Sequence, residues 1–291
     1  MKIVIFGKQF DPKQTPYVQQ LFDELYRKGT QVCVYKNYYD RIKSHINFVK
    51  KPGVFSYSKD IENLDFLFSI GGDGTLLDAI PYIQNLGVPI LGINLGRLGF
   101  LSSVSKAEMG KAIDYIYAGN YTLDQRTLLK LEKPRNLFGK LNFALNDLTI
   151  YRNNNTSLVT IHVYVNGLFL NTYWGDGLII ATPTGSTAYS MSVGGPILTP
   201  GSENFVIAPI ASHNLTVRPI VIQDNSEIRI KIEGREEKYL LSLDSRQRQI
   251  NKTEEIIINK CNFRINLVQM PEQSFFSTIR EKLLWGVDSR N

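Results

Sequence analysis

Over the first hundred residues, apolar runs of strand length alternate with segments of helical periodicity. The runs occur at residues 2–6, 31–35, 64–70 and 88–94. Between them, residues 16–28 carry apolar side chains at helical spacing (Val18, Leu21, Phe22 and Leu25), and residues 75–86 show a second helical pattern. Alternation of strands and helices predicts a doubly wound, Rossmann-like α/β domain built on a parallel sheet.

The pattern changes after a helix predicted at residues 107–117. Short β-type runs then follow one another, at 128–132, 143–151, 159–165, 168–173, 178–182, 205–208, 227–232, 239–243, 255–258 and 263–268. Asn166-Gly167, between two of these runs, is typical of a hairpin turn. Within this part only residues 186–193 look helical, and the tail returns to a helical pattern at 278–285. Strand after strand predicts a β-rich, sandwich-like second domain.

These patterns predict two domains, and 291 residues are enough for both. We expect the α/β domain to cover residues 1–102 and a β-rich nucleotide-binding domain to cover 103–271. The tail, 272–291, is expected to pack back on the first domain.

Composition and charge exclude several classes of protein. The chain is 43% hydrophobic and 21% charged, an ordinary globular balance. Its net charge of +6 suits anionic ligands, but the basic residues are dispersed and Lys50-Lys51 is only a pair, so we expect no nucleic-acid partner. Tyr38-Tyr39 is interpreted as part of a mixed surface loop rather than as a base-stacking platform.

Cysteine and histidine usage points to a cytoplasmic protein without a transition metal. Cys33 and Cys261 form no metal-binding motif and are expected to be free thiols. His45, His162 and His213 are scattered without ligand spacing. No apolar stretch reaches the roughly eighteen residues of a membrane span, and the first apolar run is too short for a signal peptide.

The most informative feature of the first domain is Gly71-Gly72-Asp73-Gly74-Thr75, which joins a buried strand to a helix. Backbone N–H groups converge on an anion at such a turn. Asp73 is unfavourable beside phosphate unless it holds a metal or accepts a proton, so the turn indicates phosphoryl transfer. No Gly-Lys-Ser/Thr follows, so backbone amides and a metal must neutralise the phosphates. Residues 94–100 also follow a strand, so both turns should line one crevice.

A second stretch comprises Asp176-Gly177 and Thr182-Pro183-Thr184-Gly185-Ser186-Thr187-Ala188-Tyr189. Three hydroxyls surround Gly185 at a predicted helix start, where they can bind phosphate or ribose. Tyr189 offers an aromatic face to a base. A capped helix without a ligand explains one hydroxyl but not this run, and Ser186 has no motif partner that would make it a hydrolase nucleophile.

Together the two stretches resemble the NAD kinase family, which transfers a phosphoryl group from ATP to the 2′-hydroxyl of NAD. The matching segments are 71–75, 94–101, 145–147, 176–196 and 278–286. The Gly-Gly-Asp-Gly-Thr sequence is shared with diacylglycerol-type lipid kinases and resembles phosphofructokinases. The run from Thr182 to Tyr189 narrows the resemblance to NAD kinases.

The resemblance implies a role for each matching position. Asp73 would be the catalytic carboxylate, acting as general base on the 2′-hydroxyl or positioning it with the metal. Asn146 and Asp147 would bind ribose hydroxyls or the adenine edge, Asp176 would hold the nicotinamide end, and residues 187–192 would cradle adenine and ribose. The full set of implied nucleotide-binding residues is Gly72, Gly74, Phe100, Asn146, Asp147, Trp174, Asp176, Thr187, Ala188, Tyr189, Ser190, Met191, Ser192, Ala211 and Arg246.

The chain departs from the family pattern at three of these positions. Asp147 stands where the family often has Glu, which gives the same charge a shorter reach. Trp174 replaces a basic or polar residue of some members, so stacking is expected instead of a charge contact. In the turn that begins at Asp244, Arg246 falls at the ligand-facing place and is expected to contact a phosphate.

The resemblance also implies ATP as donor, a divalent metal, most often Mg²⁺, a crevice between the two domains and a homodimer or homotetramer. The metal ligands are unknown from the sequence. Two alternatives stay open: a lipid kinase, which needs a deep apolar slot, and a non-catalytic dinucleotide-binding sensor. Asp73 argues against the sensor, because binding alone does not need an acid beside a phosphate.

Overall fold

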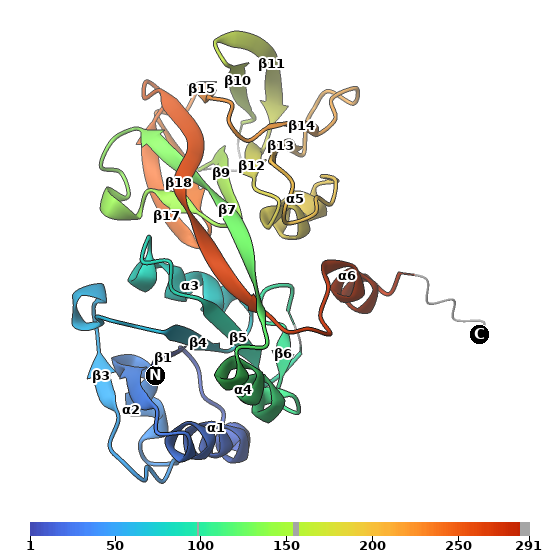
Figure 1. Cartoon of the computed structure of the whole chain (residues 1–291). Helices are drawn as coiled ribbons and strands as arrows, with labels where there is room; N and C mark the ends of the chain where they lie inside the picture. The colour runs from blue at the N-terminus through green and yellow to red at the C-terminus, as the bar shows by residue number, and fades with distance from the viewer. Residues whose placement is uncertain (98, 154–156, 286–291) are drawn as a thin grey trace. The chain divides into compact units, whose positions relative to one another are not determined.

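The computed structural model describes residues 1–97, 99–153 and 157–285 (Figure 1). The chain divides into two compact units, one of residues 1–125 with 265–291 and one of residues 126–264. The division falls later in the chain than the predicted boundary at residue 102, because helix α4 (Met109–Ala118) belongs to the first unit.

The first unit contains the expected parallel sheet. Its strands lie in the order β3 (Gly53–Phe55), β2 (Gln31–Tyr35), β1 (Lys2–Gly7), β4 (Phe66–Ile70) and β5 (Ile90–Asn94). All four neighbouring pairs are parallel. Short β6 (Val104–Ser105) pairs with the end of β5, and Leu267 of β18 (Ile256–Gln269) pairs with Ile90. The sequence prediction of a doubly wound parallel sheet is confirmed.

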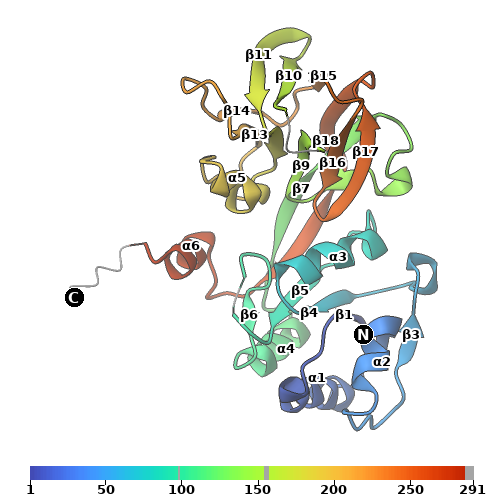
Figure 2. The ribbon, with the colours of Figure 1, turned by 180° about the vertical axis from the view of Figure 1, so that it is seen from behind.

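Helices cover both faces of this sheet, as Figures 1 and 2 show from opposite sides. Helix α1 (Thr15–Arg27) and α4 lie on one face, and α3 (Asp73–Ile83) lies on the other. The predicted apolar stripe of α1 is fully buried and packs with α4 and the strands into one core. The last helix among the described residues of this unit is α6 (Phe275–Leu283).

The interpretation of Asn37-Tyr38-Tyr39-Asp40 as a surface loop is wrong. These residues belong to helix α2 (Lys36–Ile42), and the Tyr38 side chain is completely buried. Gly7 makes room for it, because a Cβ at Gly7 would lie 2.6 Å from the Tyr38 ring. Charged neighbours on both sides concealed the burial of this aromatic residue in the sequence.

The strands of the second unit belong to two sheets, and the first of these, which also contains β7 (Thr122–Lys133) and β8 (Phe143–Ala144), is continuous through β18 with the strands of the first unit. The first sheet runs β11 (Leu168–Gly175), β10 (Val159–Val165), β15 (Ile228–Glu233) and β18; the second runs β14 (Ile220–Gln223), β13 (Asn204–Ile210), β12 (Gly177–Ala181), β9 (Asp147–Arg152), β16 (Lys238–Leu243) and β17 (Arg246–Asn251). In addition, β7 pairs with β8.

Residues of both sheets share one core, which confirms the sandwich-like architecture. Ile161 and Ile230 of the first sheet pack in the same cluster as Ile150, Ile180 and Leu241 of the second. The predicted Asn166-Gly167 hairpin is also confirmed: it joins β10 to β11, and both residues have positive φ (51° and 80°), as a type I′ turn requires.

The outer face of the six-stranded sheet is covered by the chain that follows β12. Residues such as Ile179 and Ala208 form a second apolar cluster on this face, against which Val193 and Leu198 pack. This covering segment includes a 3-10 turn (Gly185–Thr187) and the short helix α5 (Tyr189–Ser192). The glycine- and hydroxyl-rich stretch is therefore anchored on a buried sheet.

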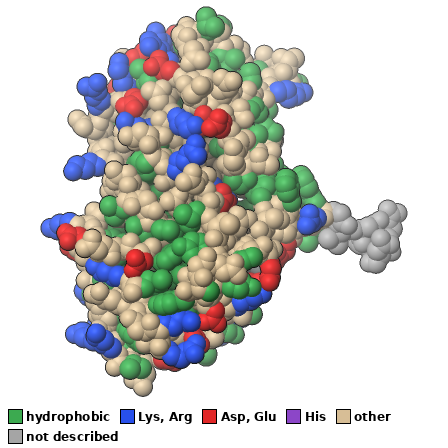
Figure 3. All heavy atoms as spheres, viewed as in Figure 1, with side chains coloured by type: hydrophobic (Ala, Val, Ile, Leu, Met, Phe, Trp, Pro, Cys, Tyr) green, Lys and Arg blue, Asp and Glu red, His purple; other side chains and the backbone are tan. Residues whose placement is uncertain are grey.

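The surface shows no single charged face in the view drawn. Lys and Arg side chains are spread over it and interspersed with Asp and Glu (Figure 3). Among the helices that the structure describes, none combines the length and the apolar character that crossing a membrane requires.

Candidate functional site

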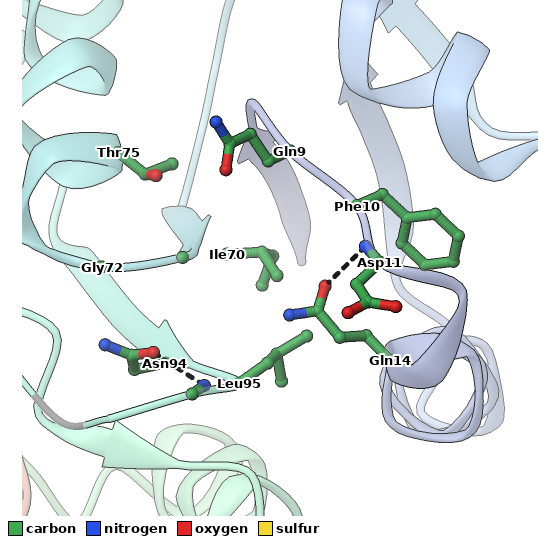
Figure 4. A pocket seen from close by; sticks show the side chains of 11 residues that line it. Gln9, Phe10, Asp11, Gln14, Ile70, Gly72, Thr75, Asn94 and Leu95 are labelled. Atoms are coloured by element: carbon green, nitrogen blue, oxygen red, sulfur yellow. Dashed lines mark hydrogen bonds between the residues drawn. The ribbon is translucent and has the colours of Figure 1, made fainter.

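A cavity of about 390 Å³ lies at the carboxyl ends of the parallel strands (Figure 4). Gly71, Gly72 and Thr75 line it from the turn after β4, and Asn94, Leu95 and Gly96 line it from the turn after β5. The prediction that these two turns share a crevice is thereby confirmed. Parallel strands place their following loops at one edge, which is where ligands bind in such sheets.

The turn after β4 is built for close approach of an anion. Gly71 has φ +144°, and a Cβ on it would lie 2.5 Å from Thr75 Oγ1, so only glycine fits. Gly72 is the N-cap of α3, and its carbonyl accepts bonds from Thr75 N (2.9 Å) and Leu76 N (3.3 Å). The first turn of α3 therefore directs backbone N–H groups and the positive end of the helix dipole at the cavity.

The turn after β5 is fixed by Asn94. Its Oδ1 accepts from Gly96 N at 2.9 Å, and its Nδ2 donates to Arg97 O at 2.5 Å. The residue is only 7% exposed. A buried amide that satisfies the backbone on both sides holds Leu95 and Gly96 in place along the cavity.

Asp73 makes a different set of contacts from the one its motif implies. Its Oδ2 accepts from Phe100 N at 2.8 Å, and its Oδ1 accepts from Leu101 N at 3.0 Å and Ser102 N at 2.9 Å. A Cβ on Gly99 would lie 1.9 Å from Oδ1, so the loop passes directly against the carboxylate. Asp73 therefore fastens the 99–102 loop to the start of α3.

Sequence reasoning missed the third loop of the cavity, which follows β1. Gln9, Phe10, Asp11 and Gln14 line this side. Asp11 caps the short turn after it: its Oδ1 accepts from Lys13 N at 2.9 Å, and Gln14 Oε1 accepts from Asp11 N at 3.2 Å. The available signal was position, since β1 is the parallel neighbour of β4 and its loop must reach the same edge.

In the second unit the structure brings two predicted motifs together. Thr182 N donates to Asn146 O at 2.9 Å, and the Thr182 hydroxyl donates to Leu145 O at 2.5 Å. A Cβ on Gly185 would lie 2.0 Å from Asn146 O. The backbone of residues 145–146 therefore packs directly against the start of the hydroxyl-rich stretch, although the two are far apart in sequence.

Asp147 is buried in this region and has an unusual acidity. Its pKa is raised to about 7, first by burial and then by the nearby Asp244 carboxylate, against a hydrogen bond from Thr149 Oγ1 to Asp147 Oδ1 (2.9 Å) that lowers it. At neutral pH this side chain can therefore either accept or donate a hydrogen bond.

The hydroxyl-rich stretch is partly engaged with its own backbone. The Ser186 hydroxyl donates to Pro183 O (2.6 Å) and accepts from Leu198 N (2.9 Å), and Thr187 Oγ1 donates to Thr184 O (3.2 Å). Arg126, which is buried, donates to Thr184 Oγ1 at 3.2 Å. These bonds fix the shape of the loop. Of the six predicted ligand positions at 187–192, Tyr189 and Ser192 are exposed, Thr187, Ala188 and Met191 are half-buried, and Ser190 is buried.

Three further predicted residues cluster at the joint of β11, β12 and β13. The Trp174 ring packs against His213 with 4.3 Å between centroids and a tilt of 41° between the rings, and it is 47% exposed. Asp176 Oδ1 pairs with Arg152 Nη2 at 3.1 Å, and Asp176 N donates to Ile210 O at 2.9 Å. Ala211, next in the chain, has φ +44°, which is uncommon for a residue with a side chain.

Arg246 lies against the backbone of its own unit. Its guanidinium donates to Leu141 O (2.5 Å) and to Phe143 O, and it is 3.7 Å from Asp244. A phosphate contact by Arg246 stays a prediction.

A cavity at a helix N-terminus, an acid in the same turn and a buried polar cluster on a β-sandwich fit a nucleotide-dependent phosphotransferase. Comparisons with known proteins support this class. Sequence models of the ATP-NAD kinase N-terminal and C-terminal domains match residues 3–121 and 145–270. The NAD kinases of Flavobacterium psychrophilum and Cytophaga hutchinsonii are 45% and 40% identical to the chain, and each comparison covers 100% of both sequences. The chain belongs to the NAD kinase family.

Solved structures support the same architecture. Yeast NADH kinase complexed with NADH has a TM-score of 0.88 at 27% identity and covers 99% of this chain and 89% of its own. An NAD kinase from Archaeoglobus fulgidus in complex with ATP has a TM-score of 0.76 at 23% identity, covers 98% of this chain and 99% of its own, and shares the fold.

Proposed function

We propose that the protein transfers the γ-phosphoryl group of ATP to the 2′-hydroxyl of the adenosine ribose of NAD, with Asp73 as the catalytic carboxylate. Family membership supports the reaction. The observation that carries the residue assignment is the position of Asp73 at the first residue of α3, in the turn that lines the anion cavity. Full-length relatives named NAD kinase leave the lipid-kinase alternative without support.

The cavity of the first unit suits the phosphates of the donor. Gly71 and Gly72 let the backbone approach closely, and the N-terminus of α3 offers N–H groups and a favourable dipole. Phosphoryl transfer needs little covalent chemistry from the protein, so alignment and charge neutralisation carry most of the catalysis.

A divalent metal, most often Mg²⁺, would complete the neutralisation. Among the described residues, no three His, Cys, Asp or Glu side chains converge. This fits Mg²⁺, which usually keeps waters and takes one or two carboxylates together with substrate phosphates. Asp11 is the one carboxylate among the described residues that line the cavity, so we assign it to hold the ion.

Asp73 would accept the proton of the 2′-hydroxyl. A carboxylate offers about four lone-pair positions, and Oδ2 accepts only the Phe100 N–H among the bonds described. The 2′-oxygen forms a bond to the γ-phosphorus, and the bond between that phosphorus and the oxygen bridging it to the β-phosphorus breaks. ADP leaves, and the proton of the 2′-hydroxyl passes to Asp73. Base catalysis of this kind contributes about 10²–10⁴-fold.

The second unit would bind NAD. We assign Asn146 and Asp147 to the ribose hydroxyls or the adenine edge, residues 187–192 to adenine and ribose, and Asp176 with Trp174 to the nicotinamide end. The Trp174 ring, half-exposed and packed against the tilted His213 ring, suits a stacking partner. Phe100, Ala211, Gly74 and Gly72 would supply apolar or backbone contacts. We also propose a cytoplasmic homodimer or homotetramer, with the two free thiols fitting a reducing compartment.

The test is NADP formation from NAD, ATP and Mg²⁺ by the purified protein, measured with an NADP-specific dehydrogenase. Asp73→Asn should lower turnover by about 10²-fold or more while NAD affinity, measured by calorimetry, is largely kept. Asp60→Asn is a matched control, because Asp60 accepts two backbone N–H bonds (2.9 Å each) in the same unit but lies outside the three turns that line the cavity.

The outcomes separate the alternatives. Wild-type protein that binds NAD but forms no NADP with any phosphoryl donor would support the sensor. Phosphorylation of diacylglycerol without binding of NAD would restore the lipid kinase. Equal losses in Asp73→Asn and Asp60→Asn would contradict the assignment of Asp73.

A further inference from the structure

Beneath Asn146 and Asp147 lies a second acid that the proposed mechanism does not use. Asp244 follows β16, and its carboxylate is only 8% exposed. We propose that Asp244 is a positioning residue, which sets the backbone of residues 145–147 so that Asn146 and Asp147 can bind the nucleotide. The inference rests on the assignment of these two residues to NAD binding.

The first argument is the number of bonds that Asp244 makes to this one segment. Its Oδ2 accepts from Leu145 N at 3.0 Å, and its Oδ1 accepts from Asn146 N at 2.7 Å and Asp147 N at 3.4 Å. In return, Asp244 N donates to Asp147 O at 3.0 Å. Three successive amides therefore converge on one buried carboxylate, which forms a compact anchor.

The second argument is the geometry of Asp244 itself. Its φ is +52°, a left-handed conformation that Asp and Asn tolerate better than most residues. This conformation occurs in the turn between β16 and β17, whose strands pair in register up to Leu243 and Arg246. The turn thus directs the carboxylate back toward β9 instead of outward.

The third argument is that the other side of the segment is already fixed. Thr182 bonds to Asn146 O and Leu145 O, and Gly185 leaves no space behind Asn146 O. The 145–147 backbone is held between this stretch and Asp244. The Asn146 side chain, which is half-buried, and the Asp147 carboxyl are then presented in one orientation. Weakening the hydrogen bonds between Asp244 and this segment should therefore reorient the Asn146 and Asp147 side chains together.

Burial raises the pKa of the Asp244 carboxyl, and the backbone amides that it accepts from, together with Arg246, oppose this shift. Groups facing Asp244 include the Asp147 carboxyl, the Arg246 guanidinium at 3.7 Å and the three backbone amides. An asparagine at 244 keeps the left-handed turn but has one acceptor oxygen, and its NH₂ group would face an N–H donor. Asp244→Asn therefore removes positioning while retaining the size of the side chain.

The experiment compares Asp244→Asn with Asp224→Asn. Asp224 is another buried acid of the same unit, but its carboxylate pairs with Lys260 at 2.7 Å, and its contacts within the described part of the chain do not include residues 145–147. For Asp244→Asn we expect the KM and the dissociation constant for NAD to rise about tenfold, with the KM for ATP changed less than about twofold. Asp224→Asn should lower the melting temperature without changing the NAD constants.

Two results would overturn the proposal. One is a pair of variants with similar losses of melting temperature and unchanged NAD affinity, which would make Asp244 a purely structural acid. The other is a variant that lowers kcat with normal NAD affinity. If Asp244→Asn does not fold, Asp244→Gly, which also permits positive φ, replaces it. Calorimetric NAD binding is measured without turnover, so it is interpretable even if the wild-type protein does not phosphorylate NAD.

Discussion

Asp147 should make the stability of the second unit fall as the pH rises. Its carboxyl is buried beside the acid Asp244, and its pKa is raised to about 7 from an ordinary value of 3.8, first by burial and then by the Asp244 charge. Asp147→Asn replaces it with a group of nearly equal size that does not ionise. The Thr149 hydroxyl, which donates to Asp147 Oδ1 at 2.9 Å, can donate to the amide oxygen instead.

The sign and size follow from proton linkage. Between pH 4 and 7 the folded protein keeps a proton on Asp147 that the unfolded chain has released, so the free energy of unfolding decreases as pH rises through this window. The shift from 3.8 to about 7 is about three units, and each unit corresponds to about 1.4 kcal/mol, so the total is about 4 kcal/mol. The stabilisation that comes from the proton retained on Asp147 is lost above about pH 7. The Asn variant has no ionisable group at this position and does not show this pH dependence.

The assay is urea unfolding of wild type and Asp147→Asn at pH 5, 6, 7 and 8, followed by tryptophan fluorescence. A Trp285→Phe background leaves Trp174, which lies in the same unit as Asp147, as the reporter. The free energy of unfolding of the variant, relative to that of the wild type, should increase by about 1.4 kcal/mol per pH unit up to pH 7 and should change little above it. Parallel stability curves over the whole range would show that Asp147 is not an elevated acid and refute the reasoning.

Three other substitutions test the site. Gly99→Ala places a Cβ 1.9 Å from Asp73 Oδ1 and should reduce turnover by about 10²-fold, with NAD binding less affected. A normal kcat would show that the contact between Asp73 and the 99–102 loop is not needed for turnover. Gly185→Ala places a Cβ 2.0 Å from Asn146 O and should lower the midpoint of urea unfolding together with NAD affinity, so a stable variant with normal affinity would be unexpected. Asp11→Asn should raise the Mg²⁺ concentration for half-maximal rate severalfold, and an unchanged metal titration would remove Asp11 as a ligand.

Much of the fold could be predicted because its signals are local. Buried parallel strands are continuous apolar runs, and the stripe of α1 has clear helical spacing. Elements without such patterns were missed: β17 (Arg246–Asn251) is mostly polar and exposed, and β3 is three residues long. The predicted strands at 255–258 and 263–268 are one strand, β18. Its first part pairs with β15 and its last part with β5, and the polar residues between these two parts continue the strand.

The candidate site was predictable where its chemistry is written in consecutive residues. The two glycine-rich stretches were found in this way, and the first of them lines the cavity. The contacts of Asp244 could not be found, because its partners lie about a hundred positions earlier and are backbone amides, which any residue supplies. Asp11 has a signal only once β1 and β4 are known to be neighbours.

The cover over the outer face of the six-stranded sheet links ligand binding to solvent exposure. Val193 and Leu198 shield Ile179 and Ala208, and they belong to the same loop whose residues 187–192 we assign to the nucleotide. Opening this loop would expose an apolar sheet face to water, so hydrophobic burial keeps the loop closed even without a ligand. A nucleotide bound there adds its own free energy to that closure, about 2.7 kcal/mol at a hundred times its dissociation constant. A nucleotide bound at the assigned residues would therefore also stabilise the sandwich, and we expect protein without it to be the form more exposed to proteolysis and aggregation.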